Sequence, residues 1–168
     1  SYKLDSEILM SQVFQKNRTD IILNPNVELS DIEIINFENL IKQRSKKRPI
    51  SYITGKKEFW KYEFTVTEDV LVPRPDTEII VEQVLKLTKN KSSLKILDIG
   101  IGSGCILLSI LKEKKCFYGT GIDICKKTLG ICKINIKKLN LINRIKLFKS
   151  DVDNFNYGKY DLIISNPP

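Results

Sequence analysis

The sequence holds 168 residues, enough for one ordinary domain or for one domain with a short appendage. Apolar residues make up 42% and charged residues 29%, as in soluble globular proteins, and no apolar run approaches the roughly 18 residues that span a bilayer. Histidine is absent, which excludes catalysis by a histidine base, and we expect no membrane partner.

The formal net charge of +8 accompanies abundant lysine, isoleucine and asparagine and a complete lack of alanine, a composition typical of an AT-rich genome. We therefore interpret the lysines mainly as solvated surface rather than as a nucleic-acid footprint. The densest basic stretch, Lys42 to Arg48, is the one place that suggests a basic contact patch.

The four cysteines form no C-x-x-C pair, which argues against a structural zinc site, and we expect no bound metal. Reduced, mostly buried thiols are typical of a reducing compartment, so we expect a cytoplasmic protein, or an organellar one if the source is eukaryotic. The sequence holds no signal for homo-oligomers, and we expect a monomer.

Residues 1–48 predict a small helical region. Its clearest signal is the capping box Ser30-Asp31-Ile32-Glu33, which apolar residues at helical spacing follow. Asn24-Pro25-Asn26 marks a turn before this helix, and Pro49 ends it. Because helices of this size bury little apolar surface alone, we interpret the region as a cap on the rest of the chain.

Residues 49–76 predict a linker built around a β-hairpin. Pro49 to Gly55 is rich in turn-forming residues, and Phe59 to Thr67 is dense in aromatic and β-branched residues, as strands are. The strip from Val72 to Glu78 is extended and rigid because of its two prolines.

Residues 77–168 predict one α/β domain. Its first helix runs through Ile80 and Leu85, and Asp76 or Thr77 can cap it. The predicted strands are Leu94–Asp98, Cys116–Ile122, Ile145–Phe148 and Tyr160–Ile164, and the helices between them are Ser103–Lys112 and Ile124–Leu139. Strands separated by helical crossovers indicate a parallel, doubly wound sheet.

A glycine-rich motif, Asp98-Ile99-Gly100-Ile101-Gly102-Ser103-Gly104, lies between a predicted strand and a predicted helix. Its glycines allow a tight turn and bring a ligand against main-chain amides. Asp123 follows the next strand, close to the ~20 residues at which a carboxylate grips a ribose diol. The motif therefore predicts a nucleotide-type cofactor site.

Two cofactor classes compete for this loop. A dinucleotide is the first, but the spacing is G-x-G-x-G, and the acid Asp98 at the start of the loop would repel a pyrophosphate. An acid there suits S-adenosylmethionine, which carries an ammonium and a sulfonium. Asp151 and Val152, after the third strand, would then flank its adenine, although Asp151 taken alone is equally typical of a loop.

The tripeptide Asn166-Pro167-Pro168 follows the fourth predicted strand. Proline fixes its own φ and pushes the preceding residue out of the helical region. The carboxamide of Asn166 is therefore expected on a stiff turn at a strand's carboxyl end, where open α/β sheets bind ligands. A simple strand-ending turn is the alternative for the tripeptide by itself.

Together, the stretch Asp98 to Cys105, the acid Asp123 and Ser165-Asn166-Pro167-Pro168 resemble the motifs of class I amino methyltransferases. The resemblance implies a Rossmann-like α/β sheet and S-adenosylmethionine as the cofactor. The cofactor residues that it implies are Asp98, Gly100, Ile101, Gly102, Ser103, Gly104, Asp123, Ile124, Asp151, Val152 and Asn166.

The segments Pro49 to Gly55, Glu58-Phe59-Trp60 and Val72 to Glu78 narrow the resemblance to the PrmC/HemK family. Its members methylate the glutamine side-chain amide in the Gly-Gly-Gln motif of peptide-chain release factors. The resemblance runs from about residue 30 to the end. It implies a release factor as the protein partner, docked in part by the helical region, and nucleic acid is not expected as the substrate.

The resemblance also implies roles around the Asn-Pro-Pro turn. The side-chain oxygen of Asn166 and the backbone carbonyl of Pro167 would accept hydrogen bonds from the substrate amide and act as the catalytic groups. Pro168 and Arg74 would complete the substrate contacts.

Three features depart from the family pattern. The family motif continues with Tyr after Asn-Pro-Pro, the family commonly has Gln where Ser51 stands, and its helical region is longer. The family sheet has seven strands, whereas the sequence predicts only the four that form its 3-2-1-4 half. We therefore expect a part of a longer polypeptide, poorly stable alone because its fourth strand is an exposed edge.

Two alternatives remain at this point. The same turn could serve an exocyclic amine of adenine or guanine in a nucleic-acid methyltransferase, which the charge of +8 favours and the proline strip disfavours. The chain could also be an inactive cofactor-binding fragment or docking module, because it holds only half of the sheet.

Overall fold

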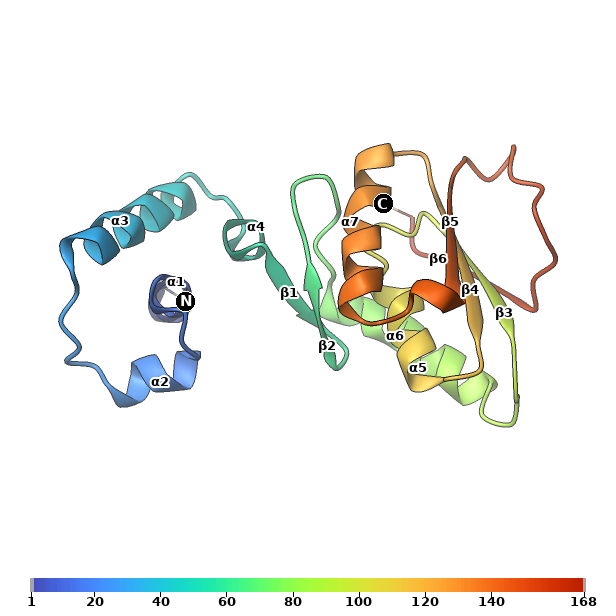
Figure 1. Ribbon diagram of the computed structural model, residues 1–168, viewed down its shortest axis with the longest axis horizontal. Coiled ribbons are helices and arrows are strands. Elements are labelled where there is room, and N and C mark those ends of the chain that lie inside the picture. Colours follow the sequence, from blue (N-terminus) through green and yellow to red (C-terminus); the bar gives the residue numbers. More distant parts are fainter. Residues whose placement is uncertain (1, 168) are drawn as a thin grey trace. The chain divides into compact units, whose positions relative to one another are not determined.

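The structure is a computed structural model that describes residues 2–167. The chain divides into two compact units, with Gly55 the last residue of the first and Lys56 the first residue of the second (Figure 1). The helices of the first unit are α1 (Tyr2–Phe14), α2 (Arg18–Leu23), α3 (Asp31–Ser45) and α4 (Ile50–Thr54). Helix α1 contacts the other three and buries Leu9 completely.

Helix α3 begins at the predicted capping box. The Ser30 hydroxyl accepts a hydrogen bond from the Glu33 backbone N–H at 3.4 Å, and the Glu33 carboxylate accepts one from the Ser30 N–H at 2.9 Å. Hydrogen bonds from Ser30 hold the pKa of Glu33 below its usual value. At the other end of α3, Arg44 forms an ion pair with Asp5 of α1 at 2.7 Å. These contacts fix both ends of the helix.

Two local expectations were wrong. The segment Pro49–Gly55, predicted as turn-rich, contains the short helix α4, which ends where Gly55 adopts φ +71°. Helix α5 (Glu78–Leu87) has no side-chain cap at Thr77, because the short 3₁₀ helix η1 (Pro75–Thr77) leads directly into it. Thr77 already has helical angles, so its side chain is not placed as an N-cap acceptor.

The predicted hairpin is confirmed. Strands β1 (Lys56–Phe59) and β2 (Tyr62–Thr65) pair antiparallel around a turn at Trp60, which adopts φ +58°. The backbone N–H of Trp60 donates to Glu78 at 2.7 Å, and its indole N–H donates to Glu113 at 3.1 Å. The turn therefore divides the aromatic and β-branched run Phe59 to Thr67 between the two strands, and two carboxylates hold the strained residue in place.

The second unit contains the predicted parallel sheet. Its strands are β3 (Lys95–Ile99), β4 (Tyr118–Asp123), β5 (Ile145–Lys149) and β6 (Leu162–Ser165), and its order is β5-β4-β3-β6. Helix α6 (Cys105–Glu113) connects β3 to β4. Helix α7 (Lys126–Lys138) and the 3₁₀ helix η2 (Ile142–Arg144) connect β4 to β5. The α/β fold and the 3-2-1-4 strand order agree with the prediction.

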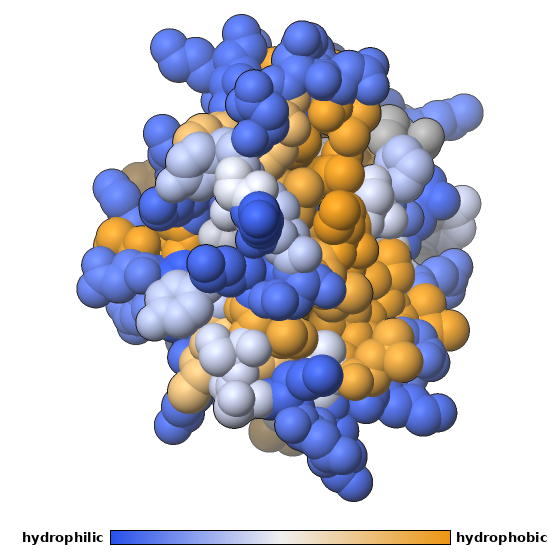
Figure 2. Space-filling model, turned by 90° about the vertical axis from the view of Figure 1, so that its right-hand side faces the viewer, coloured by the Kyte–Doolittle hydropathy of each residue, from blue (hydrophilic) through white to orange (hydrophobic). Residues whose placement is uncertain are grey.

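Helices α5, α6 and α7 cover one face of this sheet (Figure 1). Close packing on this face depends on glycine in β4, because a Cβ at Gly119 would lie 2.9 Å from Leu107 of α6, and one at Gly121 would clash with Ile101. Figure 2 shows the opposite side, where apolar side chains gather at the surface. Ile163 of β6 and Tyr118 of β4 are about half exposed. Within residues 2–167, no helix has the length and apolar character needed to cross a bilayer.

Candidate functional site

The predicted site residues follow the carboxyl ends of adjacent strands. The parallel register pairs Ile99 of β3 with Ile122 of β4 on one side and with Ser165 of β6 on the other. The glycine loop, Asp123 and Asn166 therefore emerge at one edge of the sheet, where open α/β folds bind ligands.

The glycine loop is shaped by main-chain hydrogen bonds and by three left-handed glycines. Gly100, Gly102 and Gly104 have φ values of +72°, +57° and +84°. The N–H groups of Gly100 and Ile101 both donate to the Ile122 carbonyl at 3.0 Å. A Cβ at Gly100 would meet open space, whereas one at Gly104 would lie 2.9 Å from the Cys132 sulfur. The first glycine thus leaves room for a ligand, and the last one packs against α7.

Asp123 connects the loop to the turn after β4. One of its carboxylate oxygens accepts a hydrogen bond from the Gly102 N–H at 3.2 Å, and the other accepts one from the Cys125 N–H at 2.9 Å. Both bonds come from the backbone, so they fix the carboxylate without another side chain. Free lone pairs remain on each oxygen, and a diol could donate to them.

Asp98 is the most perturbed acid of the site. Its side chain is 2% exposed, and its Oδ2 atom has no hydrogen-bond partner in the described part of the chain. The pKa of Asp98 is raised to about 8, mainly by burial; a backbone hydrogen bond at Leu107 lowers it, and the charge of Asp123 raises it. A buried acceptor without a partner suits a cationic ligand group.

Other predicted cofactor residues differ in what they expose. The Ile101 side chain is 5% exposed and belongs to the core, so its backbone is the part that a cofactor could contact. Ser103 is also buried. Ile124 and Val152 present exposed side chains, 70% and 54% accessible, next to the ends of β4 and β5.

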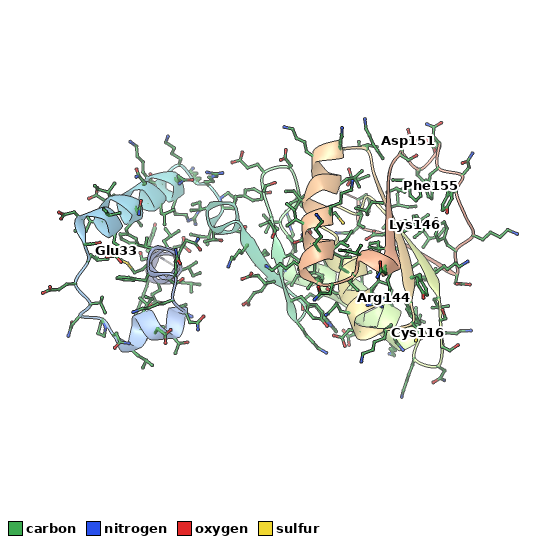
Figure 3. All side chains as sticks on the ribbon, in the orientation of Figure 1. Glu33, Cys116, Arg144, Lys146, Asp151 and Phe155 are labelled. Atoms are coloured by element: carbon green, nitrogen blue, oxygen red, sulfur yellow. The ribbon has the colours of Figure 1, made fainter. Side chains whose placement is uncertain are left out.

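Asp151 lies on the loop between β5 and β6 (Figure 3). Its carboxylate accepts hydrogen bonds from the backbone N–H and the side-chain NH₂ of Asn154, at 2.8 to 2.9 Å. Hydrogen bonds from Asn154 hold the pKa of Asp151 below its usual value. Asp151 therefore stabilises its own loop, which is the alternative that the sequence left open. The bonds to Asn154 occupy part of the hydrogen-bond acceptor capacity of its carboxylate.

The Asn-Pro turn follows β6 directly. Ser165 donates from its hydroxyl to the Ile99 carbonyl at 3.0 Å, and Asn166 and Pro167 after it are exposed. Pro168, predicted as a substrate contact, lies outside the described residues. Arg74, the remaining predicted contact, precedes η1 and is exposed.

Asn135 of α7 was not predicted from the sequence. Its side chain is completely buried and forms hydrogen bonds with the backbone of Thr65 and with the Ser103 carbonyl. The available signal was one polar residue beside Cys132 and Ile136 on the predicted apolar face. Among residues 2–167, no group of three or more potential metal ligands occurs.

Comparisons with known proteins agree with this arrangement. A family model of the PrmC N-terminal domain matches residues 1–55, and a model of the methyltransferase small domain matches residues 76–168. Curated proteins named release factor glutamine methyltransferase are similar to the chain. They include those of Caulobacter vibrioides (36% identity), Buchnera aphidicola subsp. Baizongia pistaciae (42%) and Clostridium acetobutylicum (40%).

These alignments cover 98–100% of the chain but only 57–60% of the relatives' own length. Among solved structures, a precorrin-6y C5,15-methyltransferase from Geobacter metallireducens superposes with a TM-score of 0.51 at 13% identity. The superposition covers 61% of this chain and 53% of that one. At this identity, the likeness supports the fold alone.

Proposed function

The chain belongs to the methyltransferase small domain family and carries a PrmC N-terminal domain, and from this we propose that it methylates a protein glutamine. The methyl donor is S-adenosylmethionine, and the acceptor is the side-chain amide of the Gly-Gly-Gln motif in a peptide-chain release factor. Relatives with this name, 36–42% identical over nearly the whole chain, support the proposal.

One observation carries the proposal. The pairing of Ile99 with Ser165 brings the start of the glycine loop and the start of the Asn-Pro turn to neighbouring strand ends. A cofactor held by the loop and an acceptor held by the turn would therefore meet at one edge of the sheet. Holding two reactants close together and correctly oriented can lower the barrier of a two-substrate transfer by about 7–11 kcal/mol.

The residues at this edge fit S-adenosylmethionine. The open space at Gly100 would admit it, Asp123 would hold the ribose diol, and the unpartnered oxygen of Asp98 would face its cationic groups. Asp151 and Val152 would lie against the adenine. When bound, the cofactor supplies an electrophilic methyl group on a sulfonium.

The chain's own contribution is to orient the acceptor. A primary amide nitrogen is a weak nucleophile because its lone pair is delocalised into the carbonyl. The side-chain oxygen of Asn166 and the backbone carbonyl of Pro167 accept hydrogen bonds from the two N–H groups of the substrate amide, and these bonds aim the nitrogen lone pair at the methyl group. Proline stiffens this turn, so the acceptors are preorganised. No general base is needed before the methyl group transfers, because the nitrogen loses its extra proton to solvent afterwards.

We also propose that the reaction takes place in the cytoplasm, that the protein is a monomer and that nucleic acid is not its substrate. The four cysteines, all described, are free thiols, which supports a reducing compartment. The monomeric state stays a prediction, to be measured by sedimentation.

The test is methyl transfer from labelled S-adenosylmethionine to a release factor, with the same factor lacking the Gly-Gly-Gln glutamine and bulk RNA as controls. We expect label on the intact factor only. Asn166→Ala should leave the affinity for the cofactor within about threefold and lower transfer by at least a hundredfold. Label on RNA, or near-normal transfer by the variant, would contradict the proposal.

A further inference from the structure

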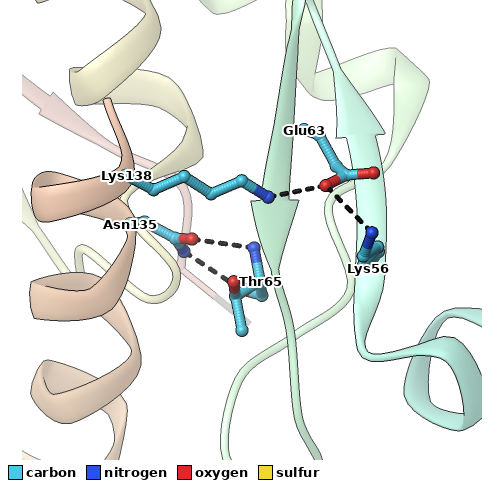
Figure 4. A network of polar contacts seen from close by, with 5 residues as sticks. All are labelled: Lys56, Glu63, Thr65, Asn135 and Lys138. Atoms are coloured by element: carbon cyan, nitrogen blue, oxygen red, sulfur yellow. Dashed lines mark hydrogen bonds and ion pairs between the residues drawn. The ribbon is translucent and has the colours of Figure 1, made fainter. Parts of the chain in front are cut away.

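The side-chain amide of Asn135 in α7 forms three hydrogen bonds with the backbone of two separate segments. Its Oδ1 atom accepts from the Thr65 N–H at 2.7 Å, and its Nδ2 atom donates to the Thr65 carbonyl at 3.0 Å (Figure 4). Asn135 thereby pairs with the free edge of β2 as a neighbouring strand would. The second Nδ2 hydrogen reaches the Ser103 carbonyl of the glycine loop at 2.9 Å.

The peptide unit between Ser103 and Gly104 is held by hydrogen bonds at both of its polar groups. The Ser103 carbonyl accepts from Asn135, and the Gly104 N–H donates to the Ile101 carbonyl at 2.9 Å. Gly104 is the left-handed residue that caps the start of α6, and a Cβ on it would lie 2.9 Å from the Cys132 sulfur of α7. The orientation of this peptide sets the path of the glycine loop into α6.

The same helix offers a contrasting link to the hairpin. Lys138 forms an ion pair with Glu63 of β2 at 2.6 Å (Figure 4). Both side chains are more than a third exposed, and within residues 2–167 neither has a hydrogen bond to the glycine loop. Exposed pairs of this kind add little stability. Asn135 of α7, unlike Lys138, therefore connects β2 and the glycine loop through a single side-chain amide.

We propose that Asn135 is a positioning residue for the cofactor loop, which makes the shape of Gly100–Gly104 depend on the docked hairpin. The identity of the cofactor rests on the proposed function, whereas the control of the loop by the hairpin does not. Because β1 directly follows Gly55, the hairpin is also the first element after the helical unit.

The test uses two variants that break the contact from opposite sides. Asn135→Leu keeps the number and branching of the side-chain heavy atoms and removes all three hydrogen bonds. Thr65→Pro removes the N–H that donates to Asn135; this N–H points away from β1, so no bond between the hairpin strands is lost. Lys138→Met is the control for the exposed link. Ile136→Ala is the control for general destabilisation, since Ile136 is a buried neighbour in the core.

Two measurements are made on each folded variant. Deuterium uptake of residues 99–105 without cofactor should rise at least threefold in Asn135→Leu and Thr65→Pro and stay unchanged in both controls. Calorimetric affinity for S-adenosylmethionine should fall at least tenfold in Asn135→Leu and at least threefold in Thr65→Pro, and less than twofold in the controls.

The outcomes separate this inference from the proposed function. Unchanged uptake in the loop, or a loss of affinity that Ile136→Ala matches at an equal drop in melting temperature, would overturn the inference. If the unaltered chain does not bind S-adenosylmethionine, the proposed function is contradicted. The deuterium uptake of residues 99–105 alone then shows whether Asn135 positions the loop. If Asn135→Leu does not fold, Thr65→Pro decides.

Discussion

The hydroxyl of Ser165 donates a hydrogen bond of 3.0 Å to the backbone carbonyl of Ile99 and so joins the last residues of β6 and β3. The glycine loop begins at the next residue after Ile99, and the Asn-Pro turn begins at the next residue after Ser165. This side chain thus adds one bond to the strand pairing that holds together the two segments with the proposed cofactor and acceptor sites.

Replacing this hydroxyl tests the link. Ser165→Ala should lower the free energy of unfolding by about 1 kcal/mol, the usual contribution of one neutral hydrogen bond, as measured by urea denaturation. Methyl transfer should fall severalfold while the affinity for S-adenosylmethionine stays the same. Ser45→Ala is the matched control, because its hydroxyl bonds to the Lys42 carbonyl within α3. An equal effect of both variants would show that the link has no special role.

Asp98 makes stability depend on pH. Its carboxyl has a pKa of about 8 when buried, against an ordinary value of 3.8, so between these pH values the folded state holds a proton that the unfolded state has lost. The free energy of unfolding should therefore fall as pH rises from 4 to 8, by up to about 1.4 kcal/mol per pH unit. Asp98→Asn should remove this slope; Asp161→Asn, a change at an exposed acid, should not.

The same acid predicts proton release on cofactor binding. A cation beside Asp98 favours the carboxylate, so the affinity for S-adenosylmethionine should rise with pH up to about 8. Calorimetry at pH 7 should then give different heats in phosphate and in Tris. The charged or titratable groups coupled to Asp98 are Asp123, Cys105 and Cys132. Equal heats in both buffers, with binding intact, would exclude the coupling.

Gly100 and Gly104 should respond differently to alanine. Both have positive φ, but a Cβ at Gly104 would collide with Cys132 and Leu108, whereas one at Gly100 would meet nothing. We expect Gly104→Ala to destabilise the fold by several kcal/mol. Gly100→Ala should cost about 1 kcal/mol but weaken cofactor binding at least tenfold, because its methyl group fills the space for the ligand. Thermal melts and calorimetry measure the two effects, and the opposite ranking would contradict the assignment.

Asp123 and Asp151 form a second contrasting pair. Asp123→Ala removes the proposed ribose acceptor and the bond that ties Gly102, so the affinity for S-adenosylmethionine should fall at least thirtyfold. Asp151→Ala should reduce it less than fivefold, because Asn154 already engages that carboxylate. A larger loss at Asp151 would mean that the carboxylate leaves Asn154 to contact the adenine.

The sheet could be predicted because its strands are short apolar runs separated by helical patterns, and two of them have clear end signals, Gly100 after β3 and Asp123 at the end of β4. The four strands lie within two residues of their predicted ranges, and the glycine loop lies where its motif indicated. Helix α4 could not be predicted, because five residues carry no helical period. Trp60 gave no turn signal, since a tryptophan at positive φ is held by carboxylates distant in the sequence.

The site was predicted by residue type but not by environment. The motif pointed to Asp98, yet its raised pKa depends on burial that only packing creates. Asn135 carries no motif, and its role depends on two backbone segments that lie 32 and 70 residues away in the sequence. Residues that bind the backbone of segments distant in the sequence cannot be identified from one sequence, because the residue types of those segments do not matter to the contact.

Trp60 is the only tryptophan in the chain, and its two hydrogen bonds attach the hairpin turn to α5 and α6. Its fluorescence therefore comes from one known contact, and an indole that loses its carboxylate partner and enters water changes its emission. The chain thus contains a native optical reporter of hairpin docking. It can follow, without any label, whether the hairpin leaves the domain before the domain itself unfolds.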